Sequence, residues 1–201
     1  MPRPDPTPGG PVWIDAAARH APLLILMHQA LFVALRVVTP GGYGIDEAEQ
    51  LLATQSVELG YGAQPPLYTW LQMAVFAVTG PGKLGLALLK HGLLAAFALA
   101  VWSSMLALTG DRRLAMVGAF ALMLAPPIGW EAHRALSHTV LALTCGAVAF
   151  RLALQCRARG RRGDFALLGL AIGAGLLAKT NVVFLVVGLV AALWRDGPAG
   201  A

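Results

Sequence analysis

The sequence is poor in charge. Only 12% of its 201 residues are Asp, Glu, Lys or Arg, and 57% are hydrophobic, against roughly 25% and 45–50% in average soluble domains. The few charges fall between long apolar runs and do not recur at helical spacing within them. This pattern excludes a soluble globular domain and predicts a polytopic membrane protein.

Three further features of the sequence restrict the functions that are possible. The only cysteines, Cys145 and Cys156, would lie about 16 Å apart along one helix, too far for a disulfide bond. No phosphate-binding glycine loop follows a strand, so no nucleotide-sugar site is expected. The net charge of +5 comes from arginines in short loops between apolar runs, which indicates membrane topology and no nucleic-acid partner.

The chain divides into a Pro- and Gly-rich tail over residues 1–21, predicted to be disordered, a membrane domain over 22–196, and a short tail over 197–201. The first apolar run lacks a small-residue cleavage site, so it is a retained span and not a signal peptide. The fold class is all-α, a transmembrane helical bundle of five or six spans. The spans expected are residues 22–39, 84–108, 114–128 and 139–155, followed by two shorter helices within 165–194.

Lys179 is the reason to expect two helices in the last apolar run. A run over 165–194 is too long for one untilted helix, and a lysine in its middle would be costly in lipid. We therefore expect a turn at Lys179 on the outer side of the membrane. Within the first of these helices, Gly169 and Gly173 are expected to allow close helix packing.

Basic residues set the orientation. The segments "GDRR" and "CRARGRRGD" carry most of the loop arginines and fall on one side of the membrane, which is therefore cytoplasmic. This predicts a multi-pass protein of the cell (inner) membrane, with its N-terminus in the cytoplasm. Because the chain stops soon after its last span, we expect it to be the N-terminal portion of something larger.

The carboxylates gather in the first outer loop, "GIDEAEQLLATQSVELGYGAQPPLYTWL". Residues 45–59 have helical spacing and are expected to lie in the membrane interface. Asp46 has two compatible interpretations, because Asp-x-x-Glu to Glu49 imitates a helix capping box, and an ionised Asp held there could accept a proton from a hydroxyl. Glu47 is a second proton acceptor or a metal ligand.

A second interfacial helix is expected after the Pro-Pro pair. Proline suits the first helical turn, so Pro66 would begin a helix that ends near residue 79 and is too short to cross the membrane. Tyr68 and Trp70 would lie at the headgroup layer. The two helices would shape a pocket at the membrane edge, although a purely structural re-entrant loop would have the same pattern.

The first outer loop, "IDEAEQLLATQSVELGYGAQPPLYTWL", resembles that of the dolichyl-phosphate-mannose protein mannosyltransferase and aminoarabinose transferase superfamily, which has the GT-C fold. The segment "GLAIGAGLLAKTNVVFLV", residues 169–186, resembles the Gly-Leu-x-x-Gly-Leu-x-x-Leu-x-Lys helix pair of the same proteins. The resemblance implies that Asp46 is the catalytic base or orients the acceptor. It also implies transfer of a sugar from a polyprenyl-phosphate carrier to a lipid, glycan or protein acceptor outside the cytoplasm, usually with inversion.

The chain departs from this family before the Pro-Pro pair. Several members have a lysine there that can meet the donor phosphate, whereas this chain has Gln64. Lys83, Arg134 and Lys179 are the cations on the outer side that are available to replace it.

A second outer loop, "PPIGWEAHRALSHTVL", lies on the same side as Asp46. By the resemblance, Glu131, His133, Arg134 and His138 would face the pocket. The alternative is an interfacial loop whose His and Trp side chains favour the headgroup layer. Glu131 and His138 could also bind a divalent metal, but two ligands without recognisable spacing are a weak signal, so no metal or other cofactor is assigned.

Four polar side chains interrupt the first two spans: His28, Arg36, Lys90 and His91. Such groups face a bundle interior or extend to the interface. Arg36 and Lys90 lie near the outer ends and are expected to extend to the interface. Cys145 is expected to be buried packing.

These observations predict a membrane glycosyltransferase that uses a polyprenyl-phosphate sugar and contacts membrane lipid. The candidate catalytic residues are Asp46 and Glu47, and the candidate substrate-binding residues are Gln64, Tyr68, Lys83, Glu131, Arg134, His138 and Lys179. Two alternatives remain. The chain could bind lipid-linked sugar without transferring it, in transport or assembly, or it could be truncated and need a C-terminal half as its partner.

Overall fold

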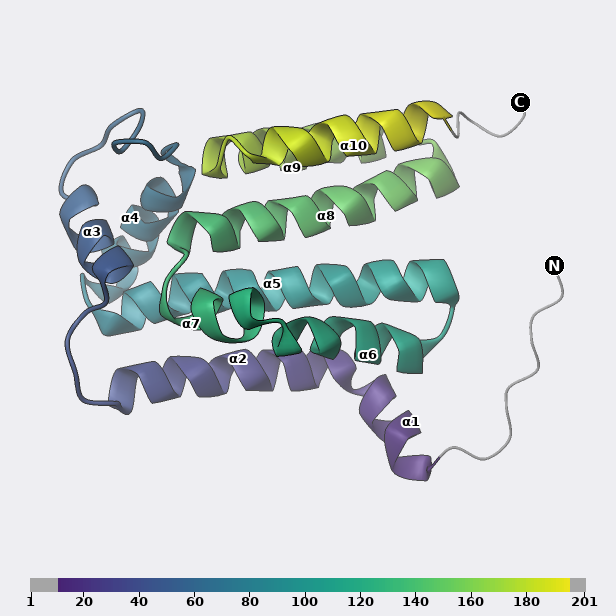
Figure 1. Cartoon of the computed structure of the whole chain (residues 1–201), viewed down its shortest axis with the longest axis horizontal. Helices are drawn as coiled ribbons and strands as arrows, with labels where there is room; N and C mark the ends of the chain where they lie inside the picture. Colours follow the sequence, from purple (N-terminus) through teal and green to yellow (C-terminus); the bar gives the residue numbers. More distant parts are fainter. Residues whose placement is uncertain (1–10, 196–201) are drawn as a thin grey trace, which may run out of the picture.

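The computed structural model describes residues 11–195, and within that range the chain forms helices and no β-strand (Figure 1). The all-α prediction is confirmed. The helices are α1 (Val12–Arg19), α2 (Ala21–Val38), α3 (Ile45–Ala53), α4 (Leu67–Thr79), α5 (Lys83–Thr109), α6 (Arg112–Ala121), η1 (Leu122–Leu124), η2 (Pro127–Glu131), α7 (Ala132–Arg134), α8 (Ser137–Arg159), α9 (Arg162–Ala178) and α10 (Val182–Arg195).

Three of these helices, α2, α5 and α8, are long and apolar enough to cross a membrane. The count among the described residues becomes four if the bent pair formed by Arg112–Leu124 and Pro127–Arg134 is one span. The expected shorter pair at the end of the chain is present as α9 and α10, and Lys179 follows α9 as its C-cap. The expected break at this lysine is therefore confirmed.

The third expected span, residues 114–128, is not a straight helix. Its two halves meet at 75°, because Pro126 and Pro127 have no backbone N–H to continue the α-helical hydrogen bonds. Gly129 allows the turn, since a Cβ atom there would lie 1.7 Å from the Met123 carbonyl oxygen. The sequence analysis treated this segment as continuous and missed the bend.

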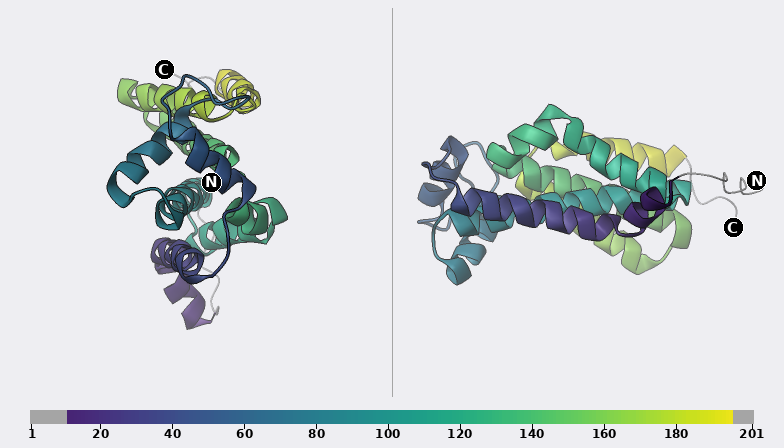
Figure 2. Two further views of the ribbon diagram at one scale, coloured as in Figure 1. Left: turned by 90° about the vertical axis from the view of Figure 1, so that its left-hand side faces the viewer. Right: turned by 90° about the horizontal axis from the view of Figure 1, so that it is seen from below.

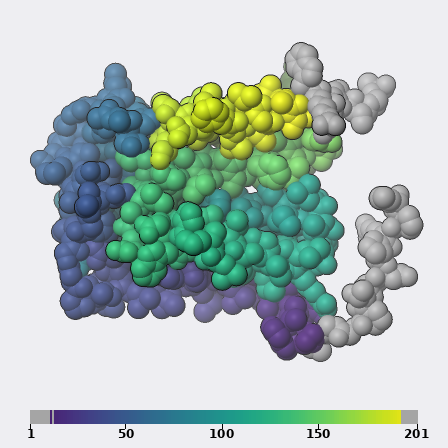
Figure 3. Space-filling model, in the orientation of Figure 1, coloured from purple at the N-terminus to yellow at the C-terminus, as the bar shows by residue number. Residues whose placement is uncertain are grey.

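The loops separate into two ends of the bundle. The arginine-rich turns, between α5 and α6 and between α8 and α9, lie at one end, whereas α3, α4 and the turn at Lys179 lie at the other (Figure 1). Viewed from this second end, α3 and α4 lie across the ends of the long helices (Figure 2). In the space-filling view the segment from α3 to α4 forms a cap over them (Figure 3). We call this the capped end, and the candidate site residues are found here.

Helix α5 is the centre of the bundle and packs against α2, α4, α6 and α8. Small side chains allow this packing, for example Ala98, which is fully buried, and Ala119 of α6, which is 1% exposed. The closest helix approach near α9 is at Gly175, where a Cβ atom would lie 2.9 Å from Val182 Cγ1. Gly169 and Gly173 have nothing within 4 Å of that position, so the prediction that they mediate close packing is wrong.

The N-terminal segment contains a helix. Residues 1–10 of the predicted disordered tail lie outside the described residues, but Val12–Arg19 forms helix α1, which corrects the prediction for that stretch. Asp15 accepts hydrogen bonds from Arg113 Nε at 2.5 Å and from Arg113 Nη2 at 2.7 Å. This ion pair ties α1 to the first turn of α6.

Candidate functional site

Helix α3 begins two residues earlier than a cap at Asp46 would require. Gly44 is the N-cap, and its N–H donates to Glu47 Oε2 at 2.9 Å. The helix ends at Ala53, short of the expected residue 59, and Leu59 is 89% exposed in the following loop. The predicted capping box of Asp46 and Glu49 is therefore replaced by one in which Glu47 reaches back to Gly44.

Glu47 is buried and paired with Arg36 at the end of α2. Arg36 donates from Nε at 2.9 Å and from Nη2 at 2.5 Å. Burial alone would raise the pKa of Glu47, but the hydrogen bonds from Arg36 and Gly44 and the charges of Arg36 and Lys90 together lower it. Arg36 does not extend freely to the interface as predicted, because it holds the start of the first outer loop against α2.

Asp46 is half-buried, and its carboxylate contacts the start of a distant helix. Asp46 Oδ2 accepts a hydrogen bond of 3.2 Å from the backbone N–H of Ser137, the first residue of α8. The preceding residue, Leu136, adopts a left-handed conformation with φ of 64°. The first N–H groups of a helix have no partner within it, and the Asp46 side chain supplies an acceptor for one of them.

Gln50 joins the two interfacial helices to α8. Its Oε1 accepts from Thr69 Oγ1 at 3.2 Å, and its Nε2 lies 3.3 Å from His138 Nε2. Gln50 is 4% exposed and Thr69 is fully buried. This polar contact fixes α3 and α4 against the first turn of α8, and so fixes the backbone that carries Asp46.

Tyr68 is not at the headgroup layer. It is 1% exposed, and its ring lies 5.2 Å from that of His138. It packs with Leu141, Cys145 and Ala178 in the core, which leaves it no surface for a substrate. The expected burial of Cys145 is confirmed.

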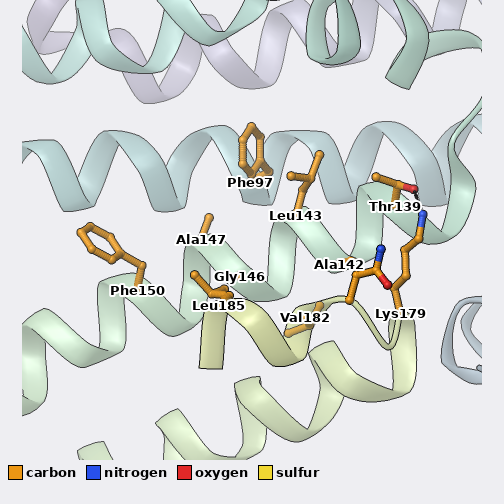
Figure 4. Close-up of a pocket in the computed structure, with 11 residues that line it drawn as sticks. Phe97, Thr139, Ala142, Leu143, Gly146, Ala147, Phe150, Lys179, Val182 and Leu185 are labelled. Atoms are coloured by element: carbon orange, nitrogen blue, oxygen red, sulfur yellow. Dashed lines mark hydrogen bonds between the residues drawn. The ribbon is translucent and has the colours of Figure 1, made fainter. Parts of the chain in front are cut away.

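Lys179 lies at one end of an apolar groove. Its Nζ donates to Thr139 Oγ1 at 2.8 Å, and Figure 4 shows its side chain pointing toward Thr139, with Phe150 at the far end of the groove. The groove has a volume of about 510 Å³ and is bounded by α5, α8 and α10, with mostly aliphatic and aromatic side chains. Thr139 and Phe150 are separated by about 16 Å of helix at about 1.5 Å per residue. We call it the α8–α10 groove.

A second pocket opens beside Glu47, between α2, α3 and the segment η2–α7. It has a volume of about 570 Å³, and its lining includes the Arg36–Glu47 pair, His91, His133, Trp130 and Arg134. We call it the Arg134 pocket. The Arg134 guanidinium stacks 5.2 Å from the centre of the Trp130 ring, and His133 packs on Phe32 with ring centres 4.1 Å apart.

Lys90 is buried next to His91, which lines the Arg134 pocket, and it does not extend to the interface, contrary to the prediction. It is 4% exposed, and its Nζ has no hydrogen-bond partner among the described residues. Glu47, Asp46 and Arg36 are the charged groups within its electrostatic reach. His91, its neighbour, is also buried, and its Nδ1–H donates a 2.9 Å hydrogen bond to Gln29 Oε1.

The remaining candidates are more loosely placed. Gln64 forms a tight backbone turn with Tyr61, with hydrogen bonds of 2.9 and 3.0 Å, and does not line either pocket named above. Lys83 donates to the Thr39 carbonyl oxygen at 3.2 Å, which links α5 to the end of α2. Glu131 is exposed. Across residues 11–195, no three His, Cys, Asp or Glu side chains are close enough to hold a metal ion.

The structure thus brings Asp46, Glu47, Arg134, His138 and Lys179 to the capped end, and it adds residues that the sequence analysis assigned elsewhere. Arg36 and Lys90 were expected to extend to the interface, and Gln50 was not considered as a contact residue. One signal was present for Arg36: a cation ends α2 shortly before the acidic start of α3. For Lys90 the sequence allowed both an interior and an interfacial position.

Comparison with known proteins agrees with the resemblance inferred from the two motifs. The chain is 36% identical over 182 residues to the lipopolysaccharide core galacturonosyltransferase RgtA of Rhizobium johnstonii, covering 88% of this chain and 36% of that protein. It is 32% identical over 171 residues to RgtB, named likewise and from the same organism, covering 85% and 35%. The chain therefore spans little more than a third of the length of these relatives. No solved structure shows a significant match.

A family profile described as dolichyl-phosphate-mannose-protein mannosyltransferase matches residues 63–199. This range begins just after α3 and includes the groove, His138 and Lys179, whereas Asp46 precedes it. Because more than half of the sequence is matched, the chain belongs to the dolichyl-phosphate-mannose-protein mannosyltransferase family, among the helical membrane glycosyltransferases of GT-C type.

Proposed function

We propose that this chain forms the donor-binding and base-bearing part of a membrane glycosyltransferase, which moves a sugar from a polyprenyl phosphate to an acceptor hydroxyl. The observation that carries the proposal is the α8–α10 groove. Its polar end is formed by Lys179 and Thr139, and Thr139 lies two residues along α8 from the backbone N–H that binds Asp46. A lipid-binding surface and a fixed carboxylate therefore meet at the capped end.

The lining of the groove suits an isoprenoid chain. Its side chains are almost all apolar, and a lipid lying along it from Thr139 toward Phe150 would be in contact with α5, α8 and α10. Lys179 would then meet the phosphate, because a cation at the end of an apolar channel favours an anionic headgroup. In this arrangement Lys179 takes the place of the family lysine that Gln64 replaces.

The chemistry assigned to the site is a single displacement. The acceptor hydroxyl oxygen attacks the anomeric carbon and forms the new C–O bond, while the bond between that carbon and the phosphate oxygen breaks. The electron pair leaves with the polyprenyl phosphate, whose charge Lys179 stabilises. Asp46 takes the hydroxyl proton. Attack opposite to the leaving phosphate gives inversion at the anomeric carbon.

Asp46 is a better base than Glu47. Arg36 and Gly44 occupy both oxygens of Glu47, whereas Asp46 uses only Oδ2, for a 3.2 Å contact. Glu47 therefore positions the loop, and Asp46 retains an oxygen for the acceptor.

The relatives supply the identity of the sugar in the proposal. Both are named lipopolysaccharide core galacturonosyltransferases, so we propose galacturonate as the transferred sugar and a lipopolysaccharide core hydroxyl as its acceptor. The basic end of the bundle would face the cytoplasm by the positive-inside rule. The capped end, and with it the transfer, would then lie on the outer face of the inner membrane, with the N-terminus in the cytoplasm.

The test is binding of radiolabelled polyprenyl phosphate to the purified chain in lipid nanodiscs, followed by transfer from polyprenyl-phosphate galacturonate in membranes. Lys179→Gln is expected to weaken lipid binding about tenfold, since a hydrogen bond between charged groups is worth about 1.5–3 kcal/mol. Asp46→Asn is expected to abolish transfer and leave binding unchanged. Arg112→Gln, an exposed change at the basic end, is the control for charge.

Failure of the wild-type chain to bind the lipid would refute the donor assignment. Binding without transfer by the chain, but transfer when it is expressed with the remainder of a relative such as RgtA, would show that both parts are needed. Transfer by that combined system that is unaffected by Asp46→Asn would refute Asp46 as the base. Lipid binding with no transfer even in the combined system would instead favour a protein that binds lipid-linked sugar for transport or assembly.

A further inference from the structure

The Arg134 pocket has more positively charged side chains than the carboxylates around it neutralise. Arg36 is engaged by Glu47, and Asp46 is the other carboxylate within reach of Lys90. Lys90 and Arg134 remain, and neither has an ion-pair partner within the described part of the chain. Among the residues that line the pocket, Arg36 and Arg134 are cations and Glu47 is a carboxylate, so the lining has one more positive than negative charge.

Two polar atoms near the pocket are buried without a partner. They are Lys90 Nζ and His133 Nδ1. Lys90 is more than nine-tenths buried, and the free energy of burying an unpaired ammonium group is strongly unfavourable. His133 and Lys90 are within electrostatic reach of each other. His133 lines the pocket, and Lys90 directly precedes the lining residue His91. This pair of unsatisfied groups therefore favours an anionic ligand with acceptor oxygens.

The mouth of the pocket has features that suit a sugar. Trp130 is 59% exposed and presents a ring on which a sugar can pack. The Arg134 guanidinium lies over that ring, and its N–H groups make no hydrogen bond with other described residues, so they are available to a ligand. A guanidinium edge donates two parallel hydrogen bonds to a carboxylate.

We propose that the Arg134 pocket binds the carboxylate of a uronic acid sugar, with Arg134 and His133 as hydrogen-bond donors, Trp130 as the packing surface, and Lys90 as a nearby buried charge. The inference rests on the proposed function, because it places the sugar of the lipid-linked donor beside Asp46. The anion could in principle be a phosphate, but the donor phosphate is already assigned to Lys179 at the end of the α8–α10 groove. A neutral hexose would leave Lys90 and Arg134 uncompensated, so this pocket would select uronic acids.

The experiment compares three probes: polyprenyl phosphate, polyprenyl-phosphate galactose and polyprenyl-phosphate galacturonate. Each is titrated into the purified chain in nanodiscs. Wild type is expected to bind the galacturonate lipid about tenfold more tightly than the galactose lipid, the effect of one hydrogen bond between charged groups. Arg134→Gln and Lys90→Met are each expected to remove most of this preference and leave the affinity for polyprenyl phosphate unchanged.

Two further variants keep the result interpretable. Arg134→Lys retains the charge without the planar fork and is expected to keep only part of the preference. Arg112→Gln is the matched control at the opposite end of the bundle and is expected to change nothing. Arg134 is exposed, so its variants test the site without depending on the folding of a buried change, and circular dichroism checks the fold of Lys90→Met.

The outcomes separate the inference from the proposed function. Equal affinity of wild type for the galactose and galacturonate lipids, with tight binding of both, would overturn the uronate pocket and leave the donor assignment intact. Equal loss of all three lipids in Arg134→Gln would instead place the phosphate in this pocket and also overturn the inference. Absence of binding to any of the three would refute the proposed function, and the uronate pocket with it.

Discussion

Asp46 and Lys179 form hydrogen bonds with two residues that lie two positions apart in the first turn of α8. Asp46 accepts from the backbone N–H of Ser137, and Lys179 donates to the side chain of Thr139. His138, between them in sequence, is within electrostatic reach of both. One helix terminus therefore sets the distance between the carboxylate of the first outer loop and the cation of the last turn.

This relationship predicts that Asp46 has separable structural and chemical roles. Asp46→Ala removes the acceptor for the Ser137 N–H and is expected to lower the free energy of unfolding by about 1 kcal/mol, as for loss of a helix cap. Asp46→Asn retains an acceptor oxygen and is expected to cost less than half of that. Thermal unfolding in detergent measures both, and equal destabilisation by the two variants would contradict the assigned contact.

The Arg36–Glu47 ion pair predicts that substitutions of these two residues have strongly non-additive effects on the free energy of unfolding. Arg36→Met leaves Glu47 buried without its cation, at an expected cost of about 2 kcal/mol. This is less than the roughly 3–5 kcal/mol of a fully buried pair, because the Arg36 side chain is 23% exposed. A double-mutant cycle with Glu47→Gln should give a positive coupling free energy, since the double variant loses less than the sum of the two changes. Additive losses would show that the pair contributes little.

Glu47 also predicts a pH dependence. Its pKa in the folded protein lies below the ordinary value of 4.5, so the native state favours the ionised form. The resulting stabilisation is fully present above the ordinary pKa, and it decreases as the pH falls through the lower, folded-state pKa. The difference in melting temperature between wild type and Glu47→Gln should therefore be constant near neutral pH and shrink below about pH 4. Glu49→Gln, on the exposed side of the same helix, is the control and should show little difference at any pH.

Gly175 and Gly169 of α9 allow a matched comparison of two glycine-to-alanine substitutions. Gly175→Ala places a Cβ atom 2.9 Å from Val182 Cγ1 and 3.3 Å from Cys145 Cβ, so α10 or α8 has to shift, and we expect a loss of about 1–3 kcal/mol. Gly169→Ala meets nothing within 4 Å and is expected to be neutral, or to stabilise the helix by up to about 1 kcal/mol. Thermal unfolding of both compares the two positions, and the opposite order would place the close helix contact at Gly169.

The parts of the fold that could be predicted from the sequence are those governed by the cost of polar groups in lipid. The break at Lys179 follows from one charge in an apolar run, and helix α4 follows from Pro66 and the length of the apolar stretch after it. The bend before Gly129 was missed, although two adjacent prolines signal it, because the mean hydropathy of the segment alone suggests a continuous span.

The sequence predicts several of the residues that belong to the site, but not the residues that they contact. Asp46 and Lys179 were both named from the motifs, yet their partners Ser137 and Thr139 come from a third segment, and no local pattern encodes that meeting. The burial of Tyr68 has the same cause. An aromatic residue in a short interfacial helix fits the headgroup layer and the bundle core equally well, and the packing of α8 and α9 determines which applies.

The bend between α6 and α7 also determines what can surround this side of the protein in a membrane. Pro126 and Pro127 interrupt the helical hydrogen bonds partway along the neighbouring α5 (Figure 1). Hydrocarbon offers no donors for freed carbonyl groups, so irregular backbone at this depth persists only against other polypeptide or water. We therefore expect water or other polypeptide to cover the flank formed by α6 and α7, whereas acyl chains suffice to surround the continuous helix α2.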